Sequence, residues 1–271
     1  MNSGLSVNRL APLTPNAWLR YDVVTRMMPP VADILEIGCG QGALGARLSA
    51  GHRYVGLEPD PQSYEVANAR LAQVEGGHGE ARNAGVEDLA AGERYDLVCA
   101  FEVLEHIEDD RKALTQWAEH VRPGGWLMLS VPAHPRRYAA ADVLVGHFRR
   151  YDPKHLAALV AKLGFENISI REYGTPLGYL LEFGRNAVAR HRLGARTAPP
   201  SMAQRTGASG RLLQPANPAV SAAARYGTAP FRRLQRRFPH GTGLVLRARL
   251  PRGLAQGTSS QEAQPAANPG R

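Results

Sequence analysis

Three alternating glycines preceded by an acid are the clearest chemical signal in this chain of 271 residues. They lie in the run Ile34-Leu35-Glu36-Ile37-Gly38-Cys39-Gly40-Gln41-Gly42. Because glycine has no Cβ, such a turn can adopt positive φ angles and let a ligand approach the backbone closely. The apolar run before the glycines and a helix from about residue 43 predict a strand, a tight turn and a helix N-terminus aimed at the ligand. This order favours a nucleotide-like ligand.

Two acids narrow the class of ligand. The glycine spacing also fits a dinucleotide-binding turn, so an NAD-type oxidoreductase is one alternative. Glu36, two residues before the first glycine, would lie at the mouth of the site, where a carboxylate repels a pyrophosphate and can pair with an ammonium group. Glu58 ends the expected strand 54–57, where a carboxylate can accept two hydrogen bonds from a ribose diol. The acids favour a cationic nucleoside over a dinucleotide.

A second chemical cluster follows the expected strand 95–100, in the run Phe101-Glu102-Val103-Leu104-Glu105-His106. In a doubly wound sheet this strand and the strand 34–37 flank the point where the strand order reverses, so their carboxyl ends form the two sides of one crevice. We therefore expect catalysis near residues 101–106.

Histidines after the strands are the candidate general bases. His106 and His147 are preferred over His134, and Tyr151 could orient either of them. Arg149 and Arg150 could bind an acidic acceptor, although a solvated pair of charges is the commoner outcome.

No metal site is predicted, but one alternative is open. Glu102, Glu105 and His106 stand within one turn, and a remote His147 could complete a set of ligands for Mg²⁺ or Zn²⁺.

The glycine run resembles the first motif of the class I S-adenosylmethionine (SAM) dependent methyltransferases, whose cofactor carries an ammonium and a sulfonium. The turn Arg122-Pro123-Gly124-Gly125 before an expected strand 126–132 strengthens the resemblance, which covers residues 30–173. The runs 101–106 and 146–151 are most similar to the small-molecule branch that includes the ubiquinone-pathway O-methyltransferases. In this family the turn at 85–89 supplies adenine contacts, often through an Asp where this chain has Gly85, so only Val86 and Glu87 can be proposed there.

The resemblance implies SAM as the cofactor and a set of residues that bind it. These are Glu36, Gly38, Cys39, Gly40, Gly42, Glu58, Pro59, Val86, Glu87, Phe101 and Glu102.

Length and composition fit one α/β domain, since 44% of the residues are hydrophobic. The family implies a doubly wound, Rossmann-like sheet of seven strands, mostly parallel, with an antiparallel last strand at 242–250. We expect a flexible leader at 1–15, a methyltransferase domain at 16–252 and a disordered tail at 253–271. No strand follows the expected sixth strand, 166–171, at once, so residues 174–240 are predicted to be a partly helical, partly disordered insertion.

The insertion is strongly basic, with 11 Arg and one acid. Segments 177–192 and 231–238 form amphipathic helices in the prediction. Such helices can rest on anionic lipid or cover a hydrophobic substrate, and a packed helix with a solvated charged face is an equal alternative. An RNA methyltransferase is a further alternative, although the region offers few aromatic residues for base stacking.

Two cysteines without CxxC spacing and the lack of a long apolar segment indicate a cytoplasmic protein, with peripheral contact to the inner membrane face as an option. The resemblance, taken with the basic insertion, implies SAM-dependent methylation, at oxygen, of a small hydrophobic or membrane-associated acceptor. A SAM-binding scaffold without catalysis is the remaining alternative, and the oligomeric state is not predicted.

Overall fold

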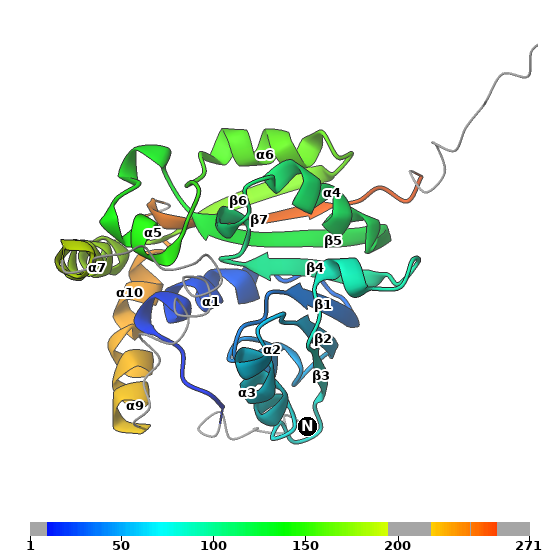
Figure 1. The fold of residues 1–271 in the computed structure, drawn as a ribbon, viewed down its shortest axis with the longest axis horizontal. Coiled ribbons are helices and arrows are strands. Elements are labelled where there is room, and N and C mark those ends of the chain that lie inside the picture. Colours follow the sequence, from blue (N-terminus) through cyan, green and yellow to red (C-terminus); the bar gives the residue numbers. More distant parts are fainter. Residues whose placement is uncertain (1–9, 195–217, 239, 254–271) are drawn as a thin grey trace, which may run out of the picture.

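A computed structural model describes residues 10–194, 218–238 and 240–253. Its centre is one sheet of seven strands in the order β3-β2-β1-β4-β5-β7-β6 (Figure 1). The strands are β1 (Asp33–Ile37), β2 (Arg53–Leu57), β3 (His78–Arg82), β4 (Tyr95–Phe101), β5 (Val121–Pro132), β6 (Glu166–Gly174) and β7 (Gly241–Arg249). Strands β1 to β5 pair in parallel, whereas β7 is antiparallel to both β5 and β6. The predicted fold class is confirmed.

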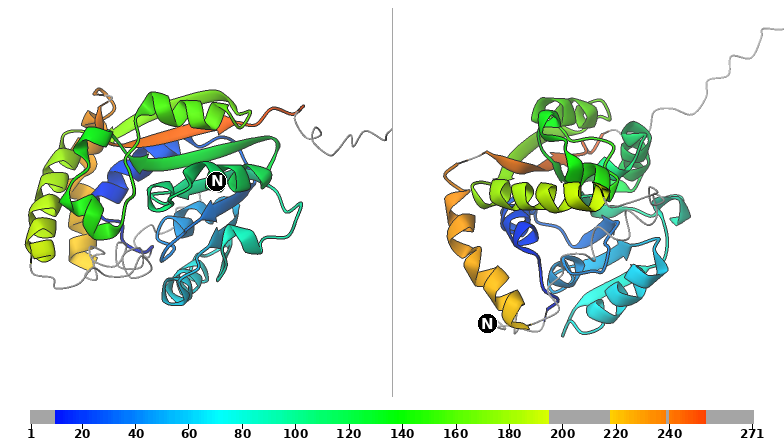
Figure 2. Two further views of the ribbon diagram at one scale, coloured as in Figure 1. Left: turned by 45° about the horizontal axis from the view of Figure 1, so that its top comes forward. Right: turned by 60° about the vertical axis from the view of Figure 1, so that its left-hand side comes forward.

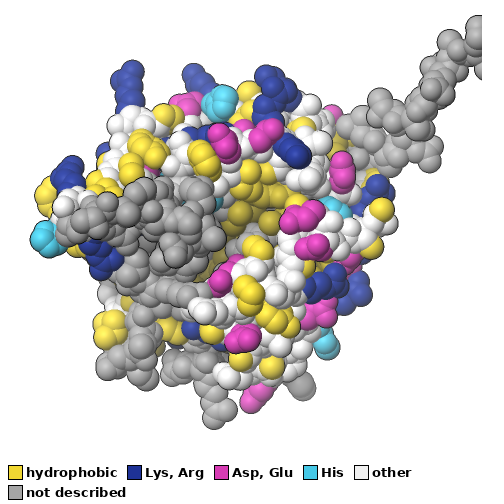
Figure 3. Space-filling view, in the orientation of Figure 1, with side chains coloured by type: hydrophobic (Ala, Val, Ile, Leu, Met, Phe, Trp, Pro, Cys, Tyr) yellow, Lys and Arg dark blue, Asp and Glu magenta, His cyan; other side chains and the backbone are white. Residues whose placement is uncertain are grey.

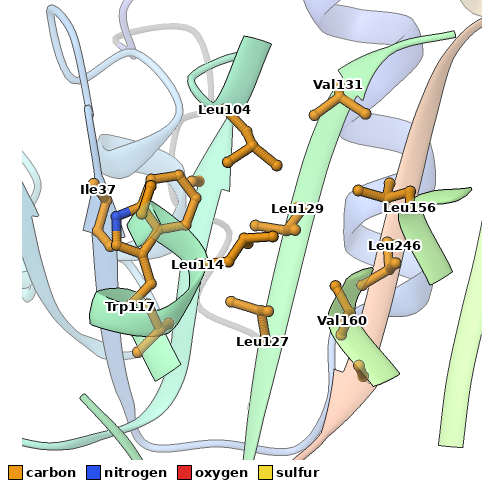
Figure 4. Packing of buried hydrophobic residues seen from close by; sticks show 14 of the residues in the cluster. Ile37, Leu104, Leu114, Trp117, Leu127, Leu129, Val131, Leu156, Val160 and Leu246 are labelled. Carbon is orange, nitrogen blue, oxygen red and sulfur yellow. The ribbon is translucent and has the colours of Figure 1, made fainter. Parts of the chain in front are cut away.

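Helices cover both faces of the sheet, which makes three layers (Figure 1). Helices α4 (Asp110–Glu119) and α6 (Pro153–Ala161) pack on one face. Helices α1 (Pro15–Met27), α2 (Gly45–Leu48) and α3 (Pro61–Leu71) pack on the other. The cluster under α4 and α6 is drawn in Figure 4, where Trp117 and Leu114 of α4 face Leu127 and Leu129 of β5. These buried side chains supply the apolar burial that holds the layers together.

The insertion between β6 and β7 is helical where the structure describes it. Helices α7 (Leu177–Gly194), α9 (Pro218–Gly227) and α10 (Ala229–Leu234) lie on one side of the molecule (Figure 2). Helix α7 contacts α5 (Ala140–Val145), a short helix that the sequence did not predict, and all three insertion helices contact α1. Because α5 follows the carboxyl end of β5, the insertion borders the expected crevice. No helix among the described residues is both long and apolar enough to cross a bilayer.

Several boundaries differ from the sequence-based expectations. The helix after the glycines is a single turn that starts at Gly45, because residues 40–44 are used by the turn itself. Packed structure also begins before residue 16, since Leu13 is buried beside Trp18. Residues 1–9, 195–217 and 254–271, which hold most of the expected leader and tail and the middle of the insertion, lie outside the described residues.

Candidate active site

The glycine turn has the conformation that its sequence requires. Gly38, Gly40 and Gly42 have φ angles of +68°, +56° and +69°. A Cβ added at Gly38 would lie 2.7 Å from Cγ2 of Val103, and one added at Gly42 would lie 3.0 Å from Cα of Ala67. A Cβ at Gly40 would meet nothing within 4 Å. The outer glycines are therefore required by packing, whereas Gly40 faces open space, where a ligand can approach.

Glu58 joins the tip of β2 to the glycine turn. Its Oε2 accepts a hydrogen bond of 2.9 Å from the Gly40 amide, and its Oε1 accepts one of 2.9 Å from the amide of Asp60. Pro59 is exposed beside it, and Cys39 is buried within the turn. These contacts hold the Glu58 carboxylate at the edge of the turn.

The sequence analysis placed Glu36 at the mouth of the site, but in the structure this residue lies deeper. Its side chain is 3% exposed because all five residues of β1 are buried, and Oε2 accepts a hydrogen bond of 2.7 Å from the Tyr54 hydroxyl. Burial raises the pKa of Glu36 to about 7, although Tyr54 and Arg20 act in the opposite direction. A cation arriving beside Glu36 would restore the ionised form.

Glu102 begins the opposite side of the crevice with a strained backbone, since its φ angle is +60°. Its Oε1 accepts hydrogen bonds from Ser130 Oγ at 2.9 Å and from the Tyr173 hydroxyl at 3.1 Å. Burial would raise the pKa of Glu102, but Arg20 and these hydrogen bonds hold it below its usual value. Phe101, just before it, is buried.

Arg20 is a site residue that the sequence analysis missed. Its Nη1 lies 3.5 Å from Oε1 of Glu102, and its charge also acts on Glu36 and Glu105. A guanidinium held among three carboxylates can bind the carboxylate of an amino-acid moiety. The available signal was a charge beside the apolar residues of α1, but only the fold shows which acids it meets.

Glu105, His106 and His147 come together on the far side of Glu102. Ligand atoms of these three side chains lie within 4.8 Å of one another, and the two imidazole rings meet edge to face with centroids 4.7 Å apart. Both carboxylate oxygens of Glu105 and Nδ1 of His106 are buried and have no hydrogen-bond partner in the described part of the chain. Burial, and then the charge of His147, lower the pKa of His106 to about 4, so this imidazole is neutral near pH 7 and can accept a proton.

A buried ion network orients His147. Nδ1 of His147 lies 2.8 Å from Oδ1 of Asp142, and Arg150 binds Asp142 and Glu182 at 2.8 Å each. Burial would raise the pKa of Asp142, but His147 and Arg150 lower it to about 2, so the carboxylate is ionised and Nδ1 of His147 donates to it. The other ring nitrogen, Nε2, is thereby left to face Glu105, at 3.8 Å. Glu182 is on α7, so the insertion takes part in placing this histidine.

Glu105, His106 and His147 could hold a divalent cation. This set differs from the one that the sequence analysis suggested, because Glu102 does not belong to it. Glu102 is turned toward Arg20 and Ser130 and is not among the grouped ligands, whereas His147 joins Glu105 and His106. The unpartnered carboxylate of Glu105 and the two imidazoles offer one oxygen and two nitrogens, a donor set that suits Zn²⁺ or Mn²⁺ better than Mg²⁺.

Other candidate residues have structural partners. The Tyr151 hydroxyl donates to Oδ2 of Asp110 at 3.0 Å, so it does not orient either histidine. Arg149 pairs with Asp110 at 2.7 Å, and His134 lies 3.2 Å from Oε2 of Glu172. Arg150 is buried in the network above, so neither arginine of the pair is available for an acidic acceptor in this arrangement.

The expected adenine turn is a 3-10 helix, η2 (Val86–Asp88), in which Val86 is half-buried and Glu87 is exposed. The amide of Gly85, the residue just before this helix, donates to the Asp88 carboxylate at 2.8 Å. The space-filling view shows hydrophobic side chains lining a hollow near the centre of one face, with acidic side chains at its border (Figure 3).

A family model described as a methyltransferase domain matches residues 12–170 of this chain. The chain belongs to this methyltransferase family. Its domain is a class I SAM-dependent methyltransferase domain, as the resemblance implied. The family match decides against the oxidoreductase alternative.

Individual relatives agree on the fold and differ in their described activities. A ubiquinone biosynthesis O-methyltransferase of Cereibacter sphaeroides is 39% identical over 126 residues, which are 45% of this chain and 50% of that protein. The chain thus matches about half the length of this curated relative. Among solved structures, a Haemonchus contortus phosphoethanolamine N-methyltransferase in complex with SAM has a TM-score of 0.54 at 16% identity, covering 90% of this chain and 54% of that one. The [4+2]-cyclase SpnF has a TM-score of 0.56 at 19% identity, covering 88% and 82%.

Proposed function

We propose that this methyltransferase transfers the methyl group of SAM to a hydroxyl oxygen of a small hydrophobic acceptor, taken up at a membrane surface. The cluster of Glu105, His106 and His147 beside the cofactor crevice carries the proposal. A hydroxyl must lose its proton when its oxygen attacks the methyl carbon, and the imidazole of His106, which is neutral near pH 7, can accept that proton at this place. The O-methyltransferase relatives support oxygen as the acceptor atom.

The cofactor would lie along the glycine turn. Glu58 would accept hydrogen bonds from the ribose hydroxyls, Glu36 would face the ammonium group, and Arg20 would face the carboxylate. The methyl group would then point toward the loop of residues 102–106. The protein's contribution to rate is chiefly alignment of the acceptor oxygen behind the methyl carbon, with removal of its proton.

A divalent cation at Glu105, His106 and His147 is the second form of this proposal. When bound, such an ion would lower the pKa of the acceptor hydroxyl as a Lewis acid. In either form the same two imidazoles are needed, so the two forms are distinguished by a chelator and not by substitution.

The exposed surface of helix α7 supports the proposal that the acceptor is held in a membrane. Its outward residues Leu180, Phe183 and Val188 are 68%, 70% and 51% exposed, and Arg185, Arg190 and Arg192 flank them. An apolar stripe bordered by arginines complements an anionic bilayer, which accepts both kinds of side chain. The helix also reaches the site through Glu182 and Arg150, so the surface and the catalytic loop are adjacent.

The test is transfer of labelled methyl from SAM into a cell extract that is separated into organic and aqueous phases, with and without chelator. We expect label in the organic phase, a loss of at least about 100-fold with His106→Ala or His147→Ala, and full activity with the control His155→Ala, which is exposed on α6. Full retention of transfer by both site variants would exclude the proposed base. Label confined to the aqueous phase would exclude a lipid-like acceptor and favour a polar metabolite or RNA.

A further inference from the structure

Three arginines from different elements surround one buried indole ring. The guanidinium carbons of Arg47, Arg232 and Arg225 lie 5.1, 5.2 and 5.9 Å from the centre of the Trp18 ring. Arg47 belongs to α2, Arg225 to α9 and Arg232 to α10, while Trp18 is in α1 and is 5% exposed. Cation–π attraction favours each guanidinium on the ring, but it does not remove the repulsion among three positive charges.

Donors in this cluster lack acceptors. Nε1 of Trp18, Nε of Arg47 and Nε of Arg232 are all buried, and none has a hydrogen-bond partner among the residues that the structure describes. Arg47 donates hydrogen bonds through Nη1 to the backbone carbonyls of Ala11 and Ala43. Arg232 donates one through Nη2 to the backbone carbonyl of Arg225. Buried donors are satisfied in nearly all folded proteins, so three around one ring indicate a missing acceptor.

The second observation concerns the charges of Arg47 and Arg232. Within residues 10–194, 218–238 and 240–253, no carboxylate forms an ion pair with Arg47 or Arg232. The nearby acid, Asp22, is already bound by Arg26 at 2.8 Å and by Arg236 at 2.6 Å. Outside these ranges, residues 1–9 and 195–217 contain no Asp or Glu, and the one acidic side chain is that of Glu262, within residues 254–271.

Burial and the neighbouring positive charges lower the pKa values of Arg47 and Arg232. Burial, and then the charges of Arg225 and Arg70, lower the pKa of Arg47 to about 10, although Tyr21 acts against them. Burial and the charge of Arg225 also lower the pKa of Arg232, although Asp22 raises it. Each charge is therefore held at a cost that an anion between them would relieve.

We propose that the cluster of Trp18, Arg47, Arg225 and Arg232 is a binding site for a phosphate-type oxyanion, outside the cofactor crevice. Guanidinium groups bind phosphate through paired N–H donors, and an anion with several acceptor oxygens can serve arginines from three elements at once. The site is open to a ligand because Arg225 and Arg232 are partly exposed. The phosphate comes either from a lipid headgroup, since the site borders the basic insertion, or from a soluble ligand.

Thermal unfolding tests the site without any need for methyl transfer. Inorganic phosphate should raise the Tm of the wild-type chain by about 3 °C more than chloride of equal ionic strength. Arg232→Gln should remove most of this increase and, in phosphate-free buffer of low salt, should leave the Tm unchanged or higher, because a repulsive charge is lost. The control Arg237→Gln, an exposed arginine of the same segment, should keep the increase.

Equal effects of phosphate and chloride on the wild type, or an undiminished phosphate effect in Arg232→Gln, would overturn the site. If Arg232→Gln does not fold, Arg225→Gln and calorimetric titration of phosphate into the wild-type chain decide instead. Flotation with phosphatidylglycerol vesicles then identifies the source. If the wild-type protein floats with the vesicles and Arg232→Gln reduces the bound fraction at least fivefold, the phosphate is that of a lipid headgroup. If phosphate stabilises the protein but the protein does not float with the vesicles, the ligand is a soluble phosphate.

Discussion

Glu36 combines full burial with a hydrogen bond from Tyr54, and its environment is incomplete without a cation. Its pKa of about 7 means that the carboxyl is half protonated at neutral pH before the cofactor binds. An ammonium group beside it would favour the ionised form, so binding of SAM should release a proton from Glu36.

We expect the affinity for SAM to increase up to about tenfold between pH 6 and 7.5, because the carboxylate must be ionised to pair with the ammonium. Glu36→Gln should weaken binding at pH 7.5 and remove the pH dependence, as measured by isothermal titration in buffers of different ionisation enthalpy. A wild-type affinity that is constant over this range would contradict the pairing.

In the cofactor-free protein the raised pKa of Glu36 affects stability in the opposite direction, so that a higher pH lowers the free energy of unfolding. Ionisation disfavours the folded state, so this contribution is lost as the pH rises from 4.5 to about 7.

Asp142 determines which nitrogen of His147 faces the site. Asp142→Asn retains the shape of the side chain but can present an N–H to Nδ1, which would move the ring proton to Nε2. We expect kcat to fall about 10- to 100-fold while the Kd for SAM stays within about twofold. Glu182→Gln is the matched control, since it weakens the partner of Arg150 without touching His147. An equal loss of kcat in both variants would indicate that the network only stabilises the fold.

At the scale of elements, the glycine turn separates packing from binding. Gly42→Ala places a Cβ against Ala67 at a φ angle of +69°, so we expect a loss of stability of about 2 kcal/mol or more. Gly40→Ala meets only the smaller backbone cost, because the space beside it is open. We expect Gly40→Ala to lose SAM affinity with the smaller decrease in Tm. Calorimetry and SAM titration on both variants check this, and a greater loss of stability in Gly40→Ala would refute it.

The sequence predicted those parts of the molecule that depend on local pattern. The strand, glycine turn and acid at the tip of β2 were readable because a ligand-binding turn needs glycine at fixed positions. Arg20 and the partners of Arg150 were not readable, because α1 and α7 are brought to the crevice only by long-range packing. The same limit explains Glu102, whose spacing suggested a metal ligand but whose positive φ angle turns it toward Arg20 and Ser130.

At the scale of the whole molecule, charge and exposed apolar surface coincide on the insertion. We expect the double variant Leu180→Ser/Phe183→Ser to reduce retention on anionic vesicles about tenfold, because two large apolar side chains no longer enter the bilayer. Methylation of a water-soluble acceptor should be unchanged. Cosedimentation with vesicles of increasing phosphatidylglycerol content measures the effect, and Val143→Ser, exposed on α5, is the control. Unchanged retention would remove α7 from the membrane proposal.

The order of strands has a consequence for biosynthesis. Strand β7 lies between β5 and β6, yet the ribosome makes it more than sixty residues after β6 ends. Until then β6 has no neighbour in the sheet, and Tyr173 at its end cannot be held against Glu102. The cofactor crevice is therefore completed only after the whole insertion has been translated, so a nascent chain stalled within the insertion would expose the edge of β5 and would not yet hold SAM as the finished enzyme does.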